Sequence, residues 1–363
     1  MNSDNNLSQS LPEMEGPVCP VPVHHHDTIV MGHGSGGRMT RDLIEDVFKP
    51  YLSSPPLLAG NDFADVIASP SGGMGRLAIS TDSHIVTPLF FPGGDIGRLA
   101  ICGTVNDICM SGAIPLYLTA GFILEEGFPI DQLKRVLASM QTAAEEAGIQ
   151  VIAGDTKVVE KGKADGIFIT TTGIGWIPAD RNIRGDQAQP DDVVLISGTL
   201  GDHGIAVLAE RGELGFSTNI ISDMAPLNSL IQDVLSAAPH THVLRDPTRG
   251  GLATTLNEIA LQSGVSMLIN EKSLPIQPGV RAACEMLGFD PLYVANEGKV
   301  IVITPADEAA DALSAMRRHH YGRNAAQIGI VQPAPAGTVL LRTLIGGTRI
   351  LDMLAGEMLP RIC

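Results

Sequence analysis

Hydrophobic and polar positions along this 363-residue chain predict short strands and amphipathic helices in two successive blocks, an α+β organisation. The clearest helix is expected over 131–147, where Leu133, Val136, Leu137 and Met140 recur at helical spacing and Gly148 provides a stop. Further helices are expected over 96–110 and 252–262, and after Gly37, where Met39, Leu43, Ile44, Val47 and Phe48 form one apolar face. Strands are expected over 27–31, 77–79, 149–152, 167–173, 193–196 and 300–304.

Local composition divides the chain into four parts. Residues 1–26 are rich in Asn, Ser, Pro and Glu, which predicts a disordered extension. A segment over 178–190, rich in Pro, Asp, Arg and Gly, predicts a linker. We therefore expect an N-terminal domain over 27–180, a second domain over 190–342, and a mobile tail over 343–363 in which glycines precede Pro360.

Charge and cysteine content restrict the class of protein. The formal net charge of -16 repels nucleic acid backbones and anionic lipid. No apolar run approaches the roughly 18 residues that span a bilayer, and the N-terminus lacks a secretion pattern, so a cytoplasmic protein is expected. The five cysteines are widely spaced and lack a C-x-x-C pair, which favours free thiols over a disulfide framework or a zinc knuckle.

A glycine-rich segment and several acidic turns are the candidates for nucleotide chemistry. Gly32, Gly34 and Gly37 fit G-x-G-x-x-G only formally, so a phosphate-binding turn and a purely structural turn both stay open. Carboxylates at strand ends or in turns are the ligands that Mg-ATP requires, and Lys157 adds a cation beside them. The alternative is a set of solvated turn acids. The acidic segments contain Asp62, Asp65, Asp82, Asp107 and Asp155.

Other positions have two interpretations each. Asp202 and His203 at a helix start are either an acid–base pair or a helix cap beside a hydrogen-bonded imidazole. Arg249 binds an external anion or an internal carboxylate, and Glu297 is either an exposed turn residue or a placed base. The run His24 to His26, close to a cysteine, contains possible Zn or Ni ligands but lacks preset geometry.

The last residue, Cys363, is suited to carrying a chemical group, because no peptide follows it and its thiol reaches furthest from the folded body. The alternative is a frayed terminus whose cysteine has no role. The cysteine of a prenylation signal lies four residues from the end, so this is not one.

Nine motifs, in this order along the chain, resemble the HypE family of hydrogenase maturation factors, which are carbamoyl dehydratases. The resemblance covers about Asp27 to Cys363. It implies a two-domain PurM-like fold, shared with aminoimidazole ribonucleotide synthetase and selenophosphate synthetase. In that fold the first-domain sheets of two protomers close into a barrel, the second domain is an α/β sandwich, and ATP binds near the dimer interface. The motifs are 32–37, 80–83, 88–94, 105–107, 154–159, 201–204, 246–251, 295–299 and 360–363.

The resemblance also implies a reaction and its residues. A carbamoyltransferase, HypF, loads a carboxamide onto Cys363, ATP drives its dehydration to a thiocyanate, and the cyanide passes to iron on a HypC–HypD complex. The resemblance implies that Lys157 and Glu297 remove protons from the carboxamide. Magnesium binding is carried over to Asp62, Asp82 and Asp107, with Asp65 the poorer match, and nucleotide binding to Gly34, Gly36, Gly37, Asn106, Asp155 and Thr156.

Two other functions compete with this one. An ATP-dependent synthetase or kinase of the same superfamily would act on a free small molecule and would keep its turnover without Cys363. A nickel or iron carrier using His24 to His26 and Cys363 would bind metal without any dependence on nucleotide. Neither uses the tail, Lys157 and the acidic cluster together.

Overall fold

The computed structural model describes residues 37–49, 51, 58, 61, 63–67, 75–212, 219–354 and 362. The strand expected over 27–31, the extension and most of the distal tail lie outside these residues. The helix expected after Gly37 is present as α1 (Arg38–Leu43), which continues as a π-turn, η2 (Ile44–Phe48). Its apolar side is not buried, since Ile44 is 43% and Val47 50% exposed.

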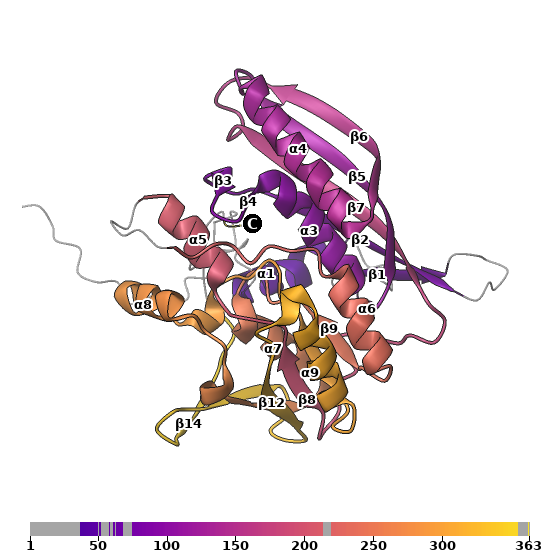
Figure 1. The fold of residues 1–363 in the computed structure, drawn as a ribbon, viewed down its shortest axis with the longest axis vertical. Coiled ribbons are helices and arrows are strands. Elements are labelled where there is room, and N and C mark those ends of the chain that lie inside the picture. Colours follow the sequence, from indigo (N-terminus) through magenta and orange to yellow (C-terminus); the bar gives the residue numbers. More distant parts are fainter. Residues whose placement is uncertain are drawn as a thin grey trace, which may run out of the picture. The chain divides into compact units, whose positions relative to one another are not determined.

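The first half is built on a five-stranded sheet (Figure 1). The strand order is β1-β2-β7-β5-β6; β5 and β6 are parallel and the other neighbours antiparallel. Among the described residues no strand pairs with the outer edges of β1 and β6, so the sheet does not close into a barrel by itself. The strands are β1 (Ala64–Ile67), β2 (Arg76–His84), β5 (Ile114–Glu125), β6 (Gln150–Val159) and β7 (Ile167–Ile177), with a separate hairpin of β3 (Phe90–Phe91) and β4 (Gly94–Asp95).

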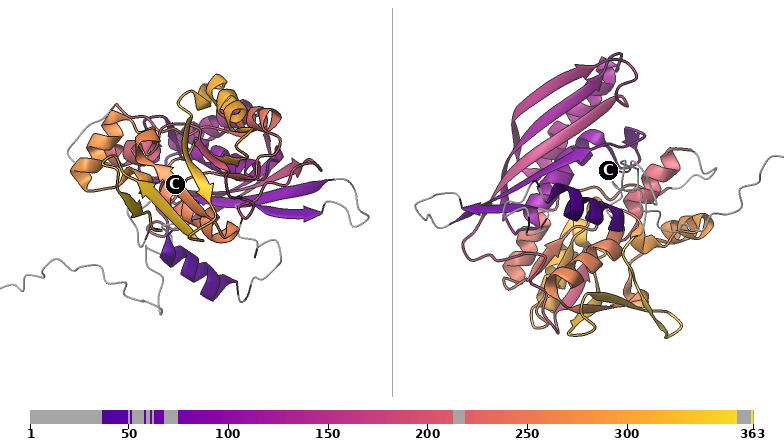
Figure 2. Two further views of the ribbon diagram at one scale, coloured as in Figure 1. Left: turned by 90° about the horizontal axis from the view of Figure 1, so that it is seen from below. Right: turned by 180° about the vertical axis from the view of Figure 1, so that it is seen from behind.

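Two helices, α3 (Ile96–Cys109) and α4 (Ile130–Ala147), lie along one face of this sheet (Figures 1 and 2). Asp95 caps α3, its Oδ1 accepting from the N–H of Gly97 at 2.7 Å. α4 ends at Gly148 with φ +66°, as expected. Val136 and Met140 are buried on α4, but Leu137 is 42% exposed, so its predicted inward position is wrong. The side chains of α4 that face the sheet form a narrow stripe along the helix, and Leu137 lies outside that stripe.

The second half contains a seven-stranded sheet in the order β14-β13-β10-β12-β8-β11-β9. Its strands are β8 (Val193–Ile196), β9 (Val243–Arg245), β10 (Ser266–Asn270), β11 (Ile301–Thr304), β12 (Ala326–Gln332), β13 (Thr338–Arg342) and β14 (Thr348–Ile350). Its helices are α5 (Asp202–Glu210), α6 (Asn228–Ala237), α7 (Gly251–Ser263), α8 (Pro278–Leu287) and α9 (Ala309–Arg318), with short 3₁₀ turns η3 (Glu271–Ser273), η4 (Pro291–Tyr293) and η5 (His320–Gly322).

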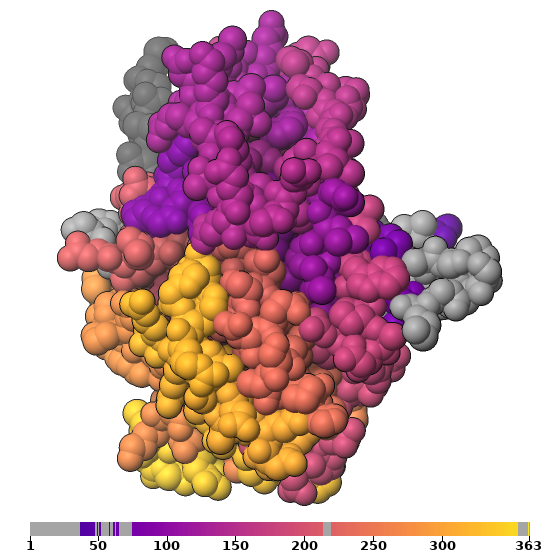
Figure 3. Space-filling model, turned by 45° about the vertical axis from the view of Figure 1, so that its right-hand side comes forward, coloured from indigo at the N-terminus to yellow at the C-terminus, as the bar shows by residue number. Residues whose placement is uncertain are grey.

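Alternating side chains of this sheet belong to two different cores. Val194 and Ile196 of β8 pack in a cluster with residues of α7, whereas Leu195 belongs to a cluster with residues of α6 and α9. The latter cluster continues through α3 to the first sheet, so the two halves share one hydrophobic core and pack closely (Figure 3). The packed chain continues to Leu351, which is fully buried after β14. The boundaries of the domains and the tail remain predictions.

Candidate active site

The candidate site lies where the helix-facing side of β2 meets the second half of the chain. Ser80, Asp82 and His84 alternate onto this side, since His84 is 2% exposed and Nε2 of its ring lies 3.2 Å from Oγ1 of buried Thr171. Asp82 is held beside it, with Oδ2 3.7 Å from that Nε2. Burial lowers the pKa of His84, and the nearby Arg249 charge lowers it further, while Asp82 opposes both.

The end of α3 supplies the next two candidate residues. Asp107 accepts a hydrogen bond from Oγ of Ser80 at 2.8 Å, which places this carboxylate on the same side as Asp82. Asn106 is 1% exposed and joins the two halves. Its amide donates to the carbonyls of Ala225 (3.0 Å) and Glu297 (3.3 Å) and accepts from the N–H of Leu227 (2.8 Å). This backbone bonding gives Asn106 a structural task, and its predicted contact with nucleotide remains untested.

Glu297 lies in the loop before β11, and its position is fixed by close backbone packing. A Cβ on Gly298 would lie 1.9 Å from the carbonyl oxygen of Asp223, so only glycine allows the two segments to meet. The N–H of Glu297 donates to Oδ1 of Asp223 at 3.1 Å. The other oxygen of that carboxylate pairs with Nζ of Lys299 at 2.9 Å, with both side chains almost fully buried.

The Glu297 side chain has the environment of a proton acceptor. It is 5% exposed, and its Oε1 has no hydrogen-bond partner in the described part of the chain. Burial raises the pKa of this carboxyl well above its usual 4.5, and the charges of Asp82, Asp246 and Asp223 raise it further, opposed by Arg249. The interpretation of Glu297 as an exposed, inert turn residue is therefore wrong.

Lys157, Asp155 and Thr156 lie on β6, the open edge strand. Nζ of Lys157 pairs with Oδ2 of Asp155 at 2.7 Å, and both side chains are about 70% exposed. This pairing lowers the pKa of Asp155. Lys157 and Asp155 thus lie side by side on the exposed edge of the sheet.

The strand register places Lys157 on the opposite face from Asp82. Asp82 is paired with Thr171, Thr171 with Ala120, and Ala120 with Gly154, which puts Gly154 on the helix-facing side. Asp155 and Lys157 alternate to the other side, and Thr156 to the helix-facing one. Three strand spacings, about 14 Å, separate β2 from β6. One chain therefore does not bring Lys157 to the face that contains Asp82.

The remaining candidates are described in part. Gly34, Gly36, Asp62 and Cys363, with His24 to His26, lie outside the described residues. At Gly37, a Cβ would lie 2.2 Å from the carbonyl oxygen of Leu354, which gives this glycine a packing reason. Within the described ranges, no group of three His, Cys, Asp or Glu side chains is assembled to hold a metal ion.

At the start of α5, Asp202 accepts from Oγ1 of Thr199 and, at 2.9 Å, from Nε2 of Gln277. It makes no cap hydrogen bond, so its interpretation as a helix cap is wrong. His203 is hydrogen-bonded on both nitrogens, as the second half of that interpretation expected.

Sequence reasoning gave no role to Asp223, which bonds the backbone of Glu297 and pairs with Lys299. It lies in a stretch without helix or strand, and the one local signal is an acid among the apolar residues of 220–227.

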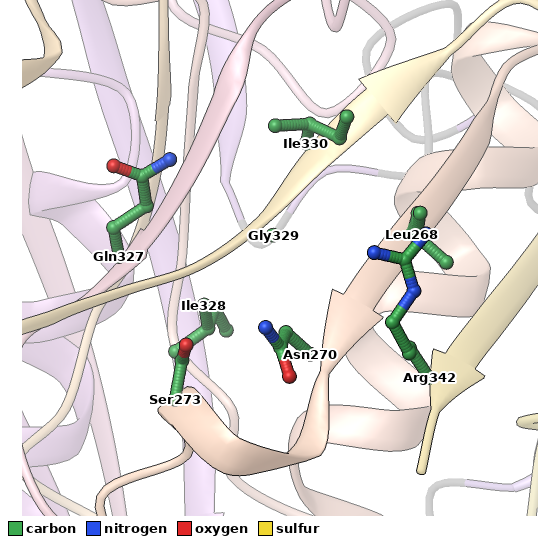
Figure 4. Close-up of a pocket in the computed structure, with 8 residues that line it drawn as sticks. All are labelled: Leu268, Asn270, Ser273, Gln327, Ile328, Gly329, Ile330 and Arg342. Carbon is green, nitrogen blue, oxygen red and sulfur yellow. The ribbon is translucent and has the colours of Figure 1, made fainter. Parts of the chain in front are cut away.

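A hollow of about 350 Å³ lies elsewhere, on β10, β12 and β13 of the second sheet (Figure 4). None of the candidate site residues lines it. Its wall includes Leu268, Asn270, Ser273, Gln327, Ile330 and Arg342, a mixture of apolar and neutral polar groups with one cation. It lacks the carboxylates that gather around Glu297.

Comparison with known proteins identifies the family. Residues 62–177 match the N-terminal domain of the AIR synthase related proteins, and residues 189–342 match their C-terminal domain. Over 335 residues the chain is 54% identical to the carbamoyl dehydratase HypE of Cupriavidus necator, which covers 92% of this chain and 95% of that protein. The chain belongs to the HypE family.

Solved structures agree with this family and with the PurM-like fold. A HypE–HypF complex contains a chain 49% identical to this one, with a TM-score of 0.81 over 86% of this chain and 99% of that chain. A HypE structure in complex with ATP is 50% identical, with a TM-score of 0.76 over 93% of this chain and all of that chain. In the described part of the chain, no helix is long and apolar enough to cross a membrane.

Proposed function

We propose that this chain is an ATP-dependent carbamoyl dehydratase that converts a carboxamide on the sulfur of Cys363 into a thiocyanate, as a source of cyanide for the iron of [NiFe]-hydrogenase. The family supports the reaction class, since relatives of about 50% identity are carbamoyl dehydratases. The observation that carries the proposal is Glu297, a buried carboxyl whose pKa is raised by burial and by three neighbouring carboxylates.

The reaction removes one water from the carboxamide. Its oxygen is a poor leaving group, so it first takes the terminal phosphoryl group of ATP, and ADP departs. The carbon–oxygen bond then breaks and inorganic phosphate leaves. The nitrogen loses both hydrogens as protons, and the freed electron pairs complete the carbon–nitrogen triple bond. No oxidant or reductant is needed, since only a water equivalent is transferred to phosphate.

Glu297 is assigned the removal of a proton from the carboxamide nitrogen. A carboxylate with a raised pKa is a stronger base than an exposed one, and the burial of Glu297 excludes competing water. Asp223 and Gly298 act indirectly, because they fix the backbone on either side of the Glu297 side chain. The Lys299 ammonium balances the charge of Asp223.

Hard oxygen donors on the helix-facing side suit a magnesium ion. We assign its binding to Asp82 and Asp107, with Asp62 as the third carboxylate, where it would offset the charge of the phosphates. Ser80 and Asp82 lie on the same side of β2, and Oγ of Ser80 donates to Asp107 on α3 at 2.8 Å, so both described carboxylates lie on that side. Gly34, Gly36, Gly37, Asn106, Asp155 and Thr156 remain the proposed contacts for the nucleotide.

We propose that a second copy of the chain binds the outer face and the open edge of the first sheet. The outer face exposes large apolar side chains of β5, namely Ile114 (45%), Tyr117 (46%) and Ile123 (42%), and the open edge strand β6 exposes Ile152 (56%) and Val158 (68%). An open strand edge with exposed apolar neighbours favours pairing with another copy. Lys157 points to this same face, so its role as a base or an electrostatic group is proposed for the assembled homodimer. HypF is the proposed donor of the carboxamide, and a HypC–HypD complex the acceptor of the cyanide.

The decisive test is intact-mass analysis of the C-terminal peptide after incubation with HypF, its substrates and Mg-ATP. When this chain does not turn over ATP, we expect Cys363 to carry the carboxamide adduct. When it does, we expect a product that is lighter by one water. Cys363→Ala is the control and should carry neither. ATP-dependent turnover that persists in Cys363→Ala and requires a free metabolite would favour a superfamily synthetase or kinase instead.

A further inference from the structure

His203 has a hydrogen-bonding partner near the chain terminus. The imidazole is fully buried in the first turn of α5, and its Nε2 lies 2.6 Å from the carbonyl oxygen of Ile362. A carbonyl only accepts, so Nε2 carries the proton. Nδ1 then accepts from Oγ of Ser222 at 2.8 Å, and that oxygen accepts from the N–H of Met224 at 3.3 Å. The network assigns one tautomer to His203.

The side chain of Ile362 is held as well. It is 6% exposed and belongs to the large hydrophobic cluster of the molecule. Phe91, from the same cluster, packs edge-on against the His203 ring, with the ring centres 5.5 Å apart. Burial lowers the pKa of His203, which keeps the ring neutral and so preserves both a donor and an acceptor.

This arrangement is tied to Glu297 by three hydrogen bonds. The N–H of Gly201 donates to Oδ1 of Asn296 at 2.7 Å, and the N–H of Gly204 donates to the carbonyl of Ala295 at 3.2 Å. On the other side, Ser222 is followed by Asp223, whose carboxylate accepts from the N–H of Glu297. Both elements that surround His203 therefore also hold the loop of the proposed base.

We propose that His203, Ser222 and Phe91 form a binding site for the penultimate residue, Ile362, and that this tail seat positions the carboxamide on Cys363 for Glu297. The proposal rests on the proposed function. Consecutive Cα atoms are about 3.8 Å apart, so fixing Ile362 restricts the place of the residue that follows. His203 is a positioning residue, because it touches the backbone of the tail and not the reacting atoms. The seat requires an apolar residue at position 362 and a neutral imidazole.

The test measures the reactivity of the Cys363 thiol toward a maleimide in a Cys19→Ser background, without nucleotide. Cys102, Cys109 and Cys284 are buried, and burial raises the thiol pKa to about 12 at Cys102 and about 11 at Cys284. Cys363 thus dominates the signal. His203→Phe removes the donor, and we expect labelling to rise about fivefold to tenfold, the factor for losing one buried hydrogen bond. Ile362→Asp should raise it similarly without altering the body of the protein.

Two further variants separate positioning from general destabilisation. His203→Gln retains a donor at the position of Nε2 and should label at close to the wild-type rate. His320→Phe changes an exposed histidine and is the matched control. Equal labelling rates in the parent, His203→Phe and Ile362→Asp would overturn the tail seat.

A single-turnover measurement then connects the seat to the reaction. On carboxamide-loaded protein, His203→Phe should slow thiocyanate formation while ATP binding stays unchanged. An unchanged rate would limit His203 to anchoring a structural terminus and so refute its positioning role. If the parent makes no thiocyanate, the proposed function fails, and the labelling rates still decide whether the tail seat exists.

Discussion

Replacing Glu297 with glutamine tests the centre of the proposed site most directly. The substitution keeps the shape of the side chain and removes its ability to ionise. Because the pKa of Glu297 is raised in the folded protein, its contribution to stability is complete below the usual value of 4.5 and is lost as pH rises toward the folded-state pKa. A glutamine at this position has no such loss, so the variant should gain stability relative to the parent as pH rises.

The expected size follows from the single proton involved. Within that pH window, one group contributes a difference of about 1.4 kcal/mol per pH unit to the free energy of unfolding. We would compare thermal unfolding of Glu297→Gln and the parent between pH 4.5 and pH 8, with Glu285→Gln, an exposed glutamate on α8, as control. Parallel curves for Glu297→Gln and the parent would show that Glu297 has no raised pKa.

Activity gives the second measurement on the same variant. Loss of a general base costs about 10²- to 10⁴-fold in rate, so carboxamide-loaded Glu297→Gln should accumulate instead of forming thiocyanate. The parent rate should rise with pH through the same window, since only the ionised carboxylate accepts a proton. Conversion of the loaded variant at the parent's rate, followed by the mass of the C-terminal peptide, would exclude Glu297 as the base.

Three other substitutions test neighbouring parts of the site. Lys157→Ala and Glu297→Gln should each be inactive as homodimers. If Lys157 serves the partner's site, mixed dimers of the two variants should regain part of the activity. No recovery would place both residues in one protomer's site. Asp82→Asn should weaken the Mg²⁺ dependence of ATP binding, measured by calorimetry across a Mg²⁺ titration, and an unchanged titration would remove Asp82 from the metal site. Gly298→Ala should destabilise the protein by about 1–3 kcal/mol in thermal unfolding, because its Cβ meets the backbone of Asp223, whereas Gly347→Ala, with no neighbour nearer than 3.4 Å, should be close to neutral.

Helices and strands were predictable where apolar spacing was regular. The strand expected over 193–196 is β8, and the helix expected over 131–147 is α4 with one additional residue at its start. Strands with polar ends were predicted too short, since β2 extends to His84 through Thr81, Asp82 and Ser83. Those side chains are polar because they face the site or the outer surface, and local hydrophobicity gives no sign that their backbone still pairs with β7.

The candidate site was predictable as a set of motifs but not as a geometry. The family resemblance marked Glu297 and Lys157 for the same chemistry, yet the placement of Lys157 depends on the face of β6 that it occupies and on pairing between distant strands. The exposure of Glu297 was undecidable locally, because its burial comes from the segment around Asp223, more than 70 residues earlier in the chain. Such contacts are set by tertiary packing, which neither propensity nor periodicity encodes.

The proposed reaction on a tethered group needs both release and accurate return, and the tail seat and the loop of Glu297 would meet these requirements with different residues. Release favours few contacts, and among the described residues Ile362 is held by one hydrogen bond to His203 and by its own buried side chain. Accurate return favours a rigid receiving surface, which is supplied by the hydrogen bonds from α5 to the loop of Glu297 and by the closely packed pair of Gly298 and Asp223. One net hydrogen bond and one buried side chain together contribute a binding free energy of only about a few kcal/mol. In the proposed tail seat, such an anchor would be strong enough to populate the bound tail and weak enough for a partner enzyme to capture Cys363 without unfolding the core.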